Sequence, residues 1–529
     1  MRESQKWVRL RLTVVTMSPE SLRRTISDFL AESRAAVVVE DGVVAFDLTE
    51  AKYSISGEYN KCLLHFWSRE RNIVRRVLDA ETKSGSLRLQ VQRMGQNRPS
   101  KLEICRDRDR RSPSSRKIAR TTYENQLRRA LQRRFPDWNV VRMATSMDLE
   151  HSFGPAYARG LMWRGQSAFA VVGVNETETQ GTIDAALTCG ILWLDSCRHR
   201  QSGHAVVQGL LLVLPKKSSA LTRERIAQLH RGAAKWQLFE FHEREACLEE
   251  IDCADRGNIA TRLVRCPDEG AARERFAESI ARVQEIFPQS QVVVLSAVEV
   301  SFRLRGLEFA RARLAHDPRS FTNEQEIVFG IGAEERVLDS PNVADFTDLM
   351  HLAAGIRHRD GPKTHPLWRM CSERWLESVV MENVAQLDGR LQQDALYSQV
   401  PAFSSADRAM IDVLTMTREG RLAVVELKAD EDIHLPLQGV DYWSRVAWHQ
   451  TRREFAKFGY FPGRELSGEK PLLLLVAPAL HVHPATDTIL KYLSREIEWE
   501  LLGIDERWRD GVRVVFRKRA ELTAKTQSA

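Results

Sequence analysis

The stretch from residue 405 to 443 constrains the fold of this chain more tightly than any other part. Two apolar segments rich in β-branched residues, 409–417 and 421–429, flank the tripeptide Arg-Glu-Gly. This pattern predicts two antiparallel strands joined by a three-residue turn, with Gly420 in the left-handed conformation. A helix is expected from about Pro436. The sequence thus predicts a strand, a turn, a second strand and a helix in close succession.

The turn also fixes how the two strands pair. If Thr417 pairs with Arg421, Asp412 lies directly opposite Glu426, and cross-strand partners share one face about 5 Å apart. Lys428 is two residues beyond Glu426 and points to that same face. Two carboxylates this close repel each other unless a proton or a cation lies between them. We therefore expect a hard divalent ion with oxygen ligands, such as Mg²⁺, at this place.

Composition sets broad limits on the protein class. The 529 residues exceed what one core can hold, and predict three or four domains. No apolar run approaches the roughly 20 residues of a membrane helix, and the first residues contain no signal-peptide segment. We expect a cytoplasmic protein with no membrane partner. The net charge of +7 favours an acidic polymer as partner, although a merely soluble basic surface explains it as well. Eight cysteines without a C-x-x-C pair indicate neither zinc nor disulfides.

Composition and periodicity divide this α/β multidomain chain into five parts. We expect an N-terminal α/β domain of unknown role over 1–104, a basic linker over 105–120, and an α/β domain over 121–247. An α/β connecting region over 248–368 and a final domain over 369–529 complete the chain.

The N-terminal part alternates strand-like and helix-like pieces. Strands are expected at 7–15, 35–48 and 86–94, around a helix at 19–32 that Ser18 caps. The segment 63–78 is interpreted as a helix. Its arginines Arg71, Arg75 and Arg76 could bind nucleic acid, but a solvated face explains them better.

The part from 121 to 247 repeats features of the final domain in the same order. The repeated pieces are Glu124-x-x-Leu127-x-x-Ala130-Leu131 with Glu373-x-x-Leu376-x-x-Val379-Val380, residues 170–175 with 423–428, residues 190–193 with 439–442, the apolar segments ending at Pro215 and Pro478, and Trp236-x-Leu238 with Trp499-x-Leu501. This order predicts a diverged duplication.

The first copy has lost the charged residues. Gly173 and Asn175 stand where the final domain has Glu426 and Lys428, and no carboxylate between Gly154 and Val174 could replace Asp412. Such a copy could support the structure, hold DNA, bind an identical subunit, or bind the other copy.

The connecting region shows two helical patterns, 272–287 and 302–315, and strand-like segments at 291–296 and 326–332. Four arginines would make the second helix basic: Arg303, Arg305, Arg311 and Arg313. The loop 358–368, with two prolines, is a natural hinge, and its His358 and His365 lack partners at a metal-ligand spacing.

The final domain opens with a helix that Ser372 can cap. Glu373 and Glu377 are four residues apart and share a face, so that either could add a carboxylate to the cluster. Their presence in the first turns also suits the helix dipole.

The helix after the hairpin carries a polar and aromatic stripe that could position phosphates and bases, although packing explains its aromatic residues as well. The stripe and the basic residues that follow it are Gln438, Tyr442, Arg445, His449, Arg452 and Arg453.

Asp412, then Glu426-Leu427-Lys428, then Gln438-x-x-x-Tyr442 resembles the core of the PD-(D/E)xK nuclease superfamily, most closely its RecB-like and NucS-like branches. The resemblance covers about 150 residues, from Glu373 to the neighbourhood of Phe516. A lone E-x-K is a weak signal, and the combination is fairly specific. The usual proline before the metal aspartate is replaced by Ile411.

The resemblance implies a restriction-endonuclease-like α/β/α domain with a mixed sheet, preceded by a degenerate copy of the same fold. It implies that Asp412, Glu426 and the backbone carbonyl of Leu427 hold Mg²⁺ or Mn²⁺, with Glu373 or Glu377 completing the shell. Lys428 would orient the attacking water, and Gln438 would complete the catalytic set.

On this basis the chain is expected to be a Mg²⁺- or Mn²⁺-dependent deoxyribonuclease in DNA repair or in defence against foreign DNA. The alternative is a non-catalytic nucleic-acid-binding or assembly protein built from two nuclease-like domains. The sequence leaves open endo or exo cleavage, the preferred DNA structure, RNA as substrate, and the oligomeric state.

Overall fold

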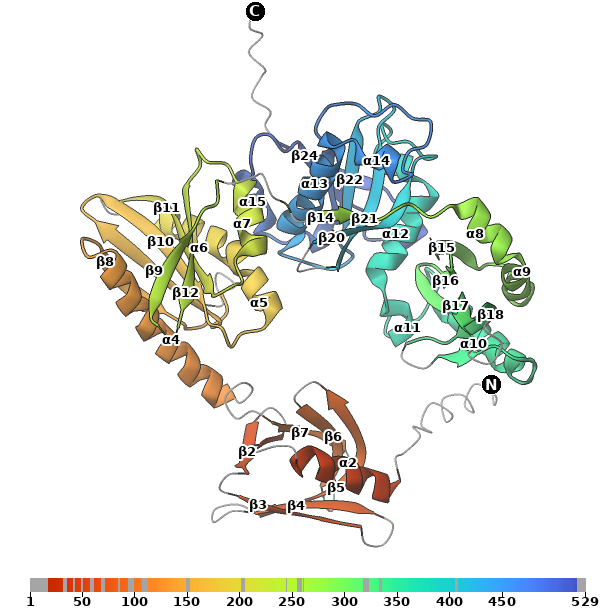
Figure 1. Ribbon diagram of the computed structural model, residues 1–529, viewed down its shortest axis with the longest axis horizontal. Coiled ribbons are helices and arrows are strands. Elements are labelled where there is room, and N and C mark those ends of the chain that lie inside the picture. Colours follow the sequence, from red (N-terminus) through yellow and green to blue (C-terminus); the bar gives the residue numbers. More distant parts are fainter. Residues whose placement is uncertain are drawn as a thin grey trace, which may run out of the picture. The chain divides into compact units, whose positions relative to one another are not determined.

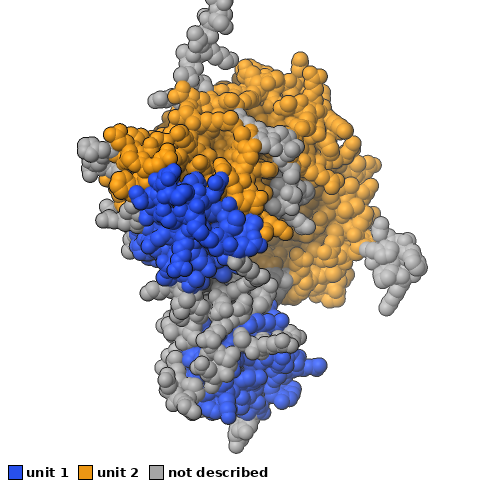
Figure 2. Space-filling model, turned by 60° about the vertical axis from the view of Figure 1, so that its left-hand side comes forward, with its two compact units in different colours: residues 1–160, 173–182, 241–248 blue, residues 161–172, 183–240, 249–529 orange. Residues whose placement is uncertain are grey.

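The computed structural model describes most of the chain, which divides into two compact units (Figure 2). One unit comprises residues 1–160, 173–182 and 241–248, and the other comprises residues 161–172, 183–240 and 249–529. The described residues are 18–31, 36–40, 43–48, 51–57, 61–67, 72–83, 86–93, 99–106, 113–148, 153–200, 205–243, 245–254, 259, 261–316, 323–332, 335–404 and 408–520.

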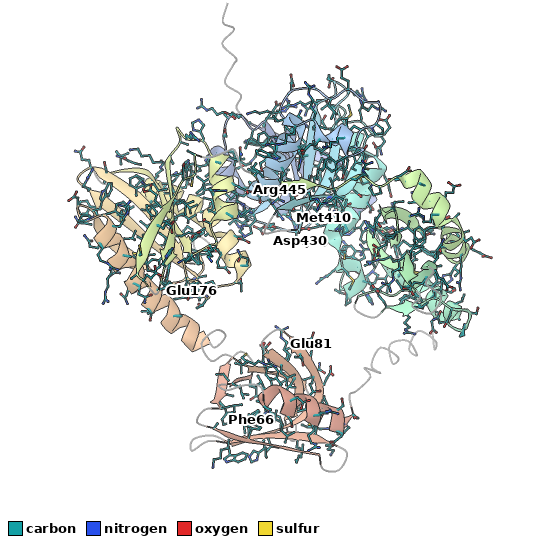
Figure 3. All side chains as sticks on the ribbon, viewed as in Figure 1. Phe66, Glu81, Glu176, Met410, Asp430 and Arg445 are labelled. Carbon is teal, nitrogen blue, oxygen red and sulfur yellow. The ribbon has the colours of Figure 1, made fainter. Side chains whose placement is uncertain are left out.

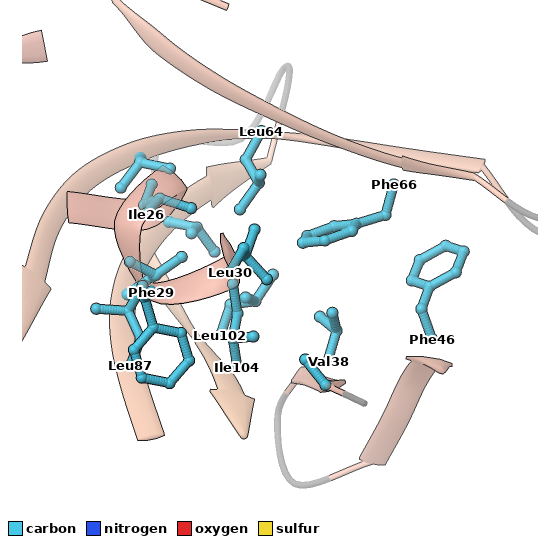
Figure 4. Close-up of a cluster of buried hydrophobic side chains, with 14 of the residues drawn as sticks. Ile26, Phe29, Leu30, Val38, Phe46, Leu64, Phe66, Leu87, Leu102 and Ile104 are labelled. Carbon is cyan, nitrogen blue, oxygen red and sulfur yellow. The ribbon is translucent and has the colours of Figure 1, made fainter. Parts of the chain in front are cut away.

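The N-terminal part is a seven-stranded antiparallel sheet with helix α2 (Pro19–Ala31) packed against it. Ile26 and Phe29 of the helix share one buried cluster with Leu64 and Ile104 of the strands (Figure 4). The sheet order is β2-β1-β7-β6-β5-β4-β3. Its strands are β1 (Val37–Glu40), β2 (Val43–Asp47), β3 (Lys52–Ser56), β4 (Cys62–Trp67), β5 (Asn72–Lys83), β6 (Ser86–Arg93) and β7 (Pro99–Cys105).

Most of the predicted elements in this part are confirmed, and one is wrong. The helix begins as expected, because the backbone N–H of Ser21 donates to Ser18 Oγ at 3.2 Å. The segment 63–78 is not a helix but forms β4 and β5. Cys62, Leu64 and Phe66 are buried in alternation, which is the period of a strand.

The three arginines of that segment have different surroundings. Arg75 pairs with Glu40 at 2.6 Å on the sheet, and Arg76 also lies on β5. Arg71 and the expected strand at 7–15 lie outside the described residues.

The predicted linker 105–120 is wrong in its second half. Helix α4 (Pro113–Arg134) begins inside it, with a proline at the first helical position, where its missing N–H costs nothing. Residues 107–112 lie outside the described part of the chain.

Helix α4 opens an α/β region, here called the upstream region (113–251), whose six-stranded sheet has the order β13-β12-β11-β10-β9-β8 (Figure 1). Its further elements are β8 (Asn139–Ala144), β9 (Tyr157–Arg164), β10 (Ser167–Val174), α5 (Gln180–Asp184), α6 (Ala186–Arg200), β11 (Val206–Pro215), α7 (Ala220–Ala227), β12 (Lys235–His242) and β13 (Cys247–Ile251).

The connecting region contains a five-stranded antiparallel sheet, β15 to β19, with its own core. The expected helix at 302–315 is wrong, because this segment forms the second half of β16 and nearly all of β17. Gly306 takes a φ of +74° in the turn between them, which a helix does not allow. The elements are α8 (Glu269–Arg275), α9 (Ala277–Ile286), β15 (Gln291–Ser296), β16 (Glu299–Leu304), β17 (Leu307–His316), β18 (Asn323–Phe329), β19 (Arg336–Val337), α10 (Val343–Ile356) and α11 (Pro366–Arg369).

The C-terminal region (372–519) is built on a mixed seven-stranded sheet of order β14-β20-β21-β22-β23-β24-β25. Strands β22, β23 and β24 are parallel, and the other pairs are antiparallel. Its elements are α12 (Ser372–Glu382), β20 (Tyr397–Ser404), β21 (Arg408–Met416), β22 (Leu422–Leu427), α13 (Leu435–Thr451), α14 (Glu454–Lys457), β23 (Leu472–Pro478), α15 (Thr486–Lys491), β24 (Trp499–Ile504) and β25 (Val514–Arg519). Edge strand β14 (Thr261–Leu263) comes from outside the expected domain 369–529.

The upstream and C-terminal regions share one order of elements along the chain. In each, a helix is followed by three strands, a long helix with one short helix beside it in the chain, a strand, a helix and two strands, and the strands take equivalent places in the two sheets. This is the order expected of two diverged copies. Across the described residues, no helix has the length and apolar character needed to cross a bilayer.

Candidate active site

The hairpin of β21 and β22 has the predicted register. Val413 pairs with Val425 and Met416 with Leu422, so that Asp412 follows opposite Glu426. The turn is closed by Gly420, whose φ is +82°. Since β22 also pairs with β23, it is an inner strand, and all six of its residues are buried.

Glu426 lies at the end of this inner strand with an exposed fraction of 1%. Its Oε1 is 3.4 Å from Lys428 Nζ, and its Oε2 has no hydrogen-bond partner among the described residues. Asp412 accepts a hydrogen bond from the backbone N–H of Leu427 at 3.0 Å. The structure therefore brings the predicted Asp, Glu and Lys together on one face.

Burial and mutual repulsion shift the pKa values of this cluster. Burial raises the pKa of Glu426 well above its ordinary range, and Asp412 raises it further against the attraction of Lys428. Burial also raises the pKa of Asp412, although the Leu427 N–H and Lys428 oppose this. Burial lowers the pKa of Lys428, but the surrounding carboxylates, Glu426 first, outweigh it and the net shift is upward. The two acids thus resist joint ionisation, and the lysine keeps its proton.

Helix α12 supplies further charged groups to the cluster. Glu373 is half-exposed and lies 3.5 Å from Lys428 Nζ. Glu377 is buried and pairs with Arg374 at 3.2 Å. Burial raises the pKa of Glu377 to about 7, and Asp412 contributes to this against the attraction of Arg374. Both expected helix carboxylates therefore lie beside the cluster, each with a cationic neighbour.

Gln399 on β20 connects two of these acids, and no sequence motif predicts its role. Its Nε2 lies 2.6 Å from Glu377 Oε2 and 3.3 Å from Asp412 Oδ1, and donates to both. Its backbone has a φ of +52°, which is unusual for a residue with a side chain. Strained backbone of this kind gathers at functional sites. A single left-handed residue inside a strand does not change the hydrophobic periodicity of the sequence. The sequence pattern therefore does not predict the position of Gln399.

A pocket of about 350 Å³ opens beside Asp412. Its volume is many times the roughly 30 Å³ of one water molecule, so that a hydrated cation and a phosphate group fit. Asp430, labelled in Figure 3, is one of the residues that line it. The pocket is lined by Cys371, Ser372, Glu373, Arg374, Glu377, Asp412 and Asp430.

The connecting region holds α12 in place. Gly306 approaches the helix so closely that a Cβ there would lie 2.1 Å from the carbonyl oxygen of Arg374. Arg357 is fully buried and stacks on Trp375. It donates hydrogen bonds to the backbone oxygen of Arg305 in the β16–β17 turn, at 2.8 Å, and to that of Met370 just before α12, at 2.6 Å. The arginine fixes the β16–β17 turn against the start of the helix that lines the pocket.

Helix α13 divides the predicted nucleic-acid-binding residues into two groups. Tyr442 is buried near the acids, and burial together with Glu426 raises its pKa. Arg445 and His449 are 2% and 3% exposed, and His449 hydrogen bonds to Glu454 and Thr261. They belong to the interior of the fold and not to a surface that DNA could contact.

The remaining residues of that helix and its end are more accessible. Gln438 is half-buried in the first turns, and its side chain makes no hydrogen bond within the described ranges. Arg452 and Arg453 are exposed, with Arg452 stacked on Trp448 at 3.4 Å. Of the basic residues predicted on this stripe, these two keep their charge at the surface.

The equivalent place in the upstream region is filled. A Cβ on Gly173 would lie 2.5 Å from Leu127 Cδ2 and 2.6 Å from the hydroxyl oxygen of Tyr123, both on α4. Asn175 turns back on the chain and accepts the N–H of Thr177 at 2.7 Å. Aromatic and aliphatic groups thus occupy the space that the C-terminal region gives to carboxylates.

Searches of protein-family models, curated proteins and solved structures found no match for this chain.

Proposed function

We propose that this chain is a metal-dependent nuclease that hydrolyses phosphodiester bonds, with DNA as the expected substrate. Its C-terminal region would have the restriction-endonuclease-like fold. The observation that carries the proposal is the convergence of Asp412 of β21 with Glu426 and Lys428 at the end of β22, next to the pocket that Asp412 and α12 line. Buried like charges cost stability, and a fold that needed only packing would place apolar residues there.

The residues fit a divalent cation. Glu426 keeps one buried oxygen without a hydrogen-bond partner among the described residues, and Asp412, opposite it on β21, lines the pocket. These two would hold Mg²⁺ or Mn²⁺, together with the Leu427 carbonyl oxygen and either Glu373 or Glu377. When bound, such an ion lowers the pKa of a water molecule and neutralises charge on a phosphate.

The protein groups around the cluster have separate tasks. Lys428 stays protonated among its carboxylates, so it would donate hydrogen bonds that hold a water or a phosphate oxygen. Glu377 has a pKa of about 7 and would exchange a proton near neutral pH. Arg374 lines the pocket and offers positive charge to the phosphodiester. The exposed Arg452 and Arg453 would contact backbone phosphates further along the strand.

The test is a cleavage assay with labelled linear, nicked, branched and single-stranded DNA, with Mg²⁺, with Mn²⁺ and with chelator. Cleavage is expected only with metal, and Asp412→Ala or Glu426→Ala should abolish it. Glu124→Ala changes the upstream counterpart of Glu373 and serves as the control that should keep full activity. Cleavage that survives both C-terminal substitutions would refute the site. Binding without cleavage under every metal would instead favour a nucleic-acid-binding or assembly protein.

A further inference from the structure

A short β-bridge joins the upstream and C-terminal regions through equivalent residues. Leu229, between α7 and β12, pairs with Leu493, between α15 and β24. The N–H of His230 donates to the carbonyl oxygen of Tyr492 at 2.8 Å, and the N–H of Ser494 donates to that of Gln228 at 2.8 Å. Each segment therefore meets its own counterpart in antiparallel orientation.

The flanking helices repeat this reciprocity. Helix α6 packs against α15, and α13 packs against α7. In the shared order of elements α6 corresponds to α13, and α7 corresponds to α15. Contacts of this form, in which i meets j and j meets i, are those of an isologous interface around a twofold axis.

Glycines at one position in the two longer helices support this correspondence. Gly190 of α6 would place a Cβ 2.7 Å from Leu210 of β11. Gly439 of α13 would place one 2.4 Å from Leu475 and 3.2 Å from Leu473 of β23. Both helices lie close on the equivalent strand of their own sheet, and so present equivalent outer faces.

Buried polar contacts hold the two sets of helices together. Arg225 of α7 forms a forked ion pair with Asp441 of α13, at 3.0 and 2.7 Å, and both side chains are about 90% buried. Arg198 of α6 donates to the Tyr492 hydroxyl at 3.1 Å. Charge pairs this buried require a fixed geometry, because each partner alone would be a desolvated charge.

We propose that residues 183–240 occupy the place of a second nuclease subunit, so that one chain is an internal pseudo-dimer with a single competent site. The proposal rests on the nuclease function proposed above. The face formed by α13, α15 and residues 492–494 is already covered, and the chain has no need of another copy there. In the upstream region, Gly173 stands where a metal-binding glutamate would be, and Tyr123 and Leu127 fill the space above it. One binding event on duplex DNA therefore breaks one strand and leaves a nick.

A plasmid assay tests the number of cuts. Supercoiled DNA is incubated with the full chain and Mn²⁺ under single-turnover conditions, and the products are followed over time. Nicked circles are expected first, with linear DNA appearing only after a lag, as second cuts accumulate independently. Linear DNA formed from the first time points, in constant proportion to nicked circles, would overturn the proposal while leaving the nuclease function intact.

The pairing itself is tested without DNA. Arg225→Asp and Asp441→Arg are each expected to lower the melting temperature by several degrees, and the double variant to recover most of the loss. Light scattering should find one chain per particle. The pseudo-dimer would be overturned if the double variant lost as much melting temperature as the two single variants added together. A stable two-chain particle would overturn it as well. If the wild-type chain cuts no DNA under any metal, the nuclease function fails, and these two measurements alone decide the pairing.

Discussion

The upstream and C-terminal regions arrange the same succession of helices and strands, and they differ in what lies between the first helix and the inner strands. In the C-terminal region this space contains Asp412, Glu426 and Lys428. In the upstream region Tyr123 and Leu127 fill it against Gly173. The fold accepts either filling. The fold therefore requires only that this layer be packed, whereas the proposed chemistry requires that it carry charged residues.

The largest expected effect is at Glu426. Glu426→Gln should lower metal-dependent cleavage by about a thousandfold or more, because the carboxylate charge that holds the ion is gone. The same change should raise the melting temperature of the metal-free protein by a few degrees, because an amide avoids the cost of burying a carboxyl group here and, next to that, the repulsion from Asp412. Cleavage assays measure the loss of activity, and thermal melts of the wild type and the variant, with and without Mn²⁺, measure the change in stability. A variant that is less stable without metal would show that Glu426 has a structural task that Gly173 does not share.

The next effect is a pH dependence of stability at Glu377. Its folded pKa of about 7 lies above the ordinary 4.5, so that the folded state binds the proton more tightly. The resulting stabilisation is complete below pH 4.5 and is lost as the pH rises through 7, with a total of about 3 kcal/mol. Urea unfolding at pH 4.5 and pH 8 should show this loss in the wild type.

Glu377→Gln isolates the contribution of that carboxyl. The variant cannot ionise, so its free energy of unfolding should fall about 3 kcal/mol less between the two pH values. Equal pH dependence in the wild type and in Glu377→Gln would contradict the buried position of this group.

A smaller effect is expected at Gly173. Gly173→Ala would force Leu127 and Tyr123 apart and should destabilise the protein by about 1–3 kcal/mol. Gly181→Ala is the matched control, because nothing lies within 4 Å of a Cβ there. Chemical denaturation measures both. If Gly173→Ala is as stable as the control, the upstream space is not filled in solution, and the contrast between the regions is lost.

The smallest effect concerns the surface. Removing Arg452 and Arg453 together by alanine substitution should weaken DNA binding without abolishing cleavage, and should reduce the salt dependence of binding by roughly two phosphate contacts. Lys216→Ala with Lys217→Ala removes two charges from the upstream region and serves as the control. Binding titrations at several salt concentrations give the slopes. An unchanged slope would place the nucleic-acid path away from the end of α13.

The site could be predicted from the sequence where local pattern defines the geometry. It could not be predicted where the position of a residue depends on contacts with segments far away in the chain. The hairpin register followed from Gly420 and the alternation of two strands, and so placed Asp412, Glu426 and Lys428 correctly. Helical spacing predicts that the polar stripe of α13 positions phosphates and bases, but Arg445 and His449 are buried in the fold. Helical spacing defines which residues share a face, and not what packs against that face.

The sequence by itself determined the order of elements in the C-terminal region, the repeat of that order in the upstream region, and the charges that one copy keeps and the other lacks. These follow from periodicity and residue type, which act over a few residues. Only the tertiary structure decided that segments 63–78 and 302–315 are strands. Each forms a hairpin, and further strands of its sheet, β3 and β6 or β15 and β18, pair with the outer sides of that hairpin. Only the tertiary structure revealed Gln399, the clamp of Arg357 on α12, and the reciprocal contact of Leu229 with Leu493. Each depends on backbone geometry or on contacts between residues far apart in the chain, which no local pattern encodes.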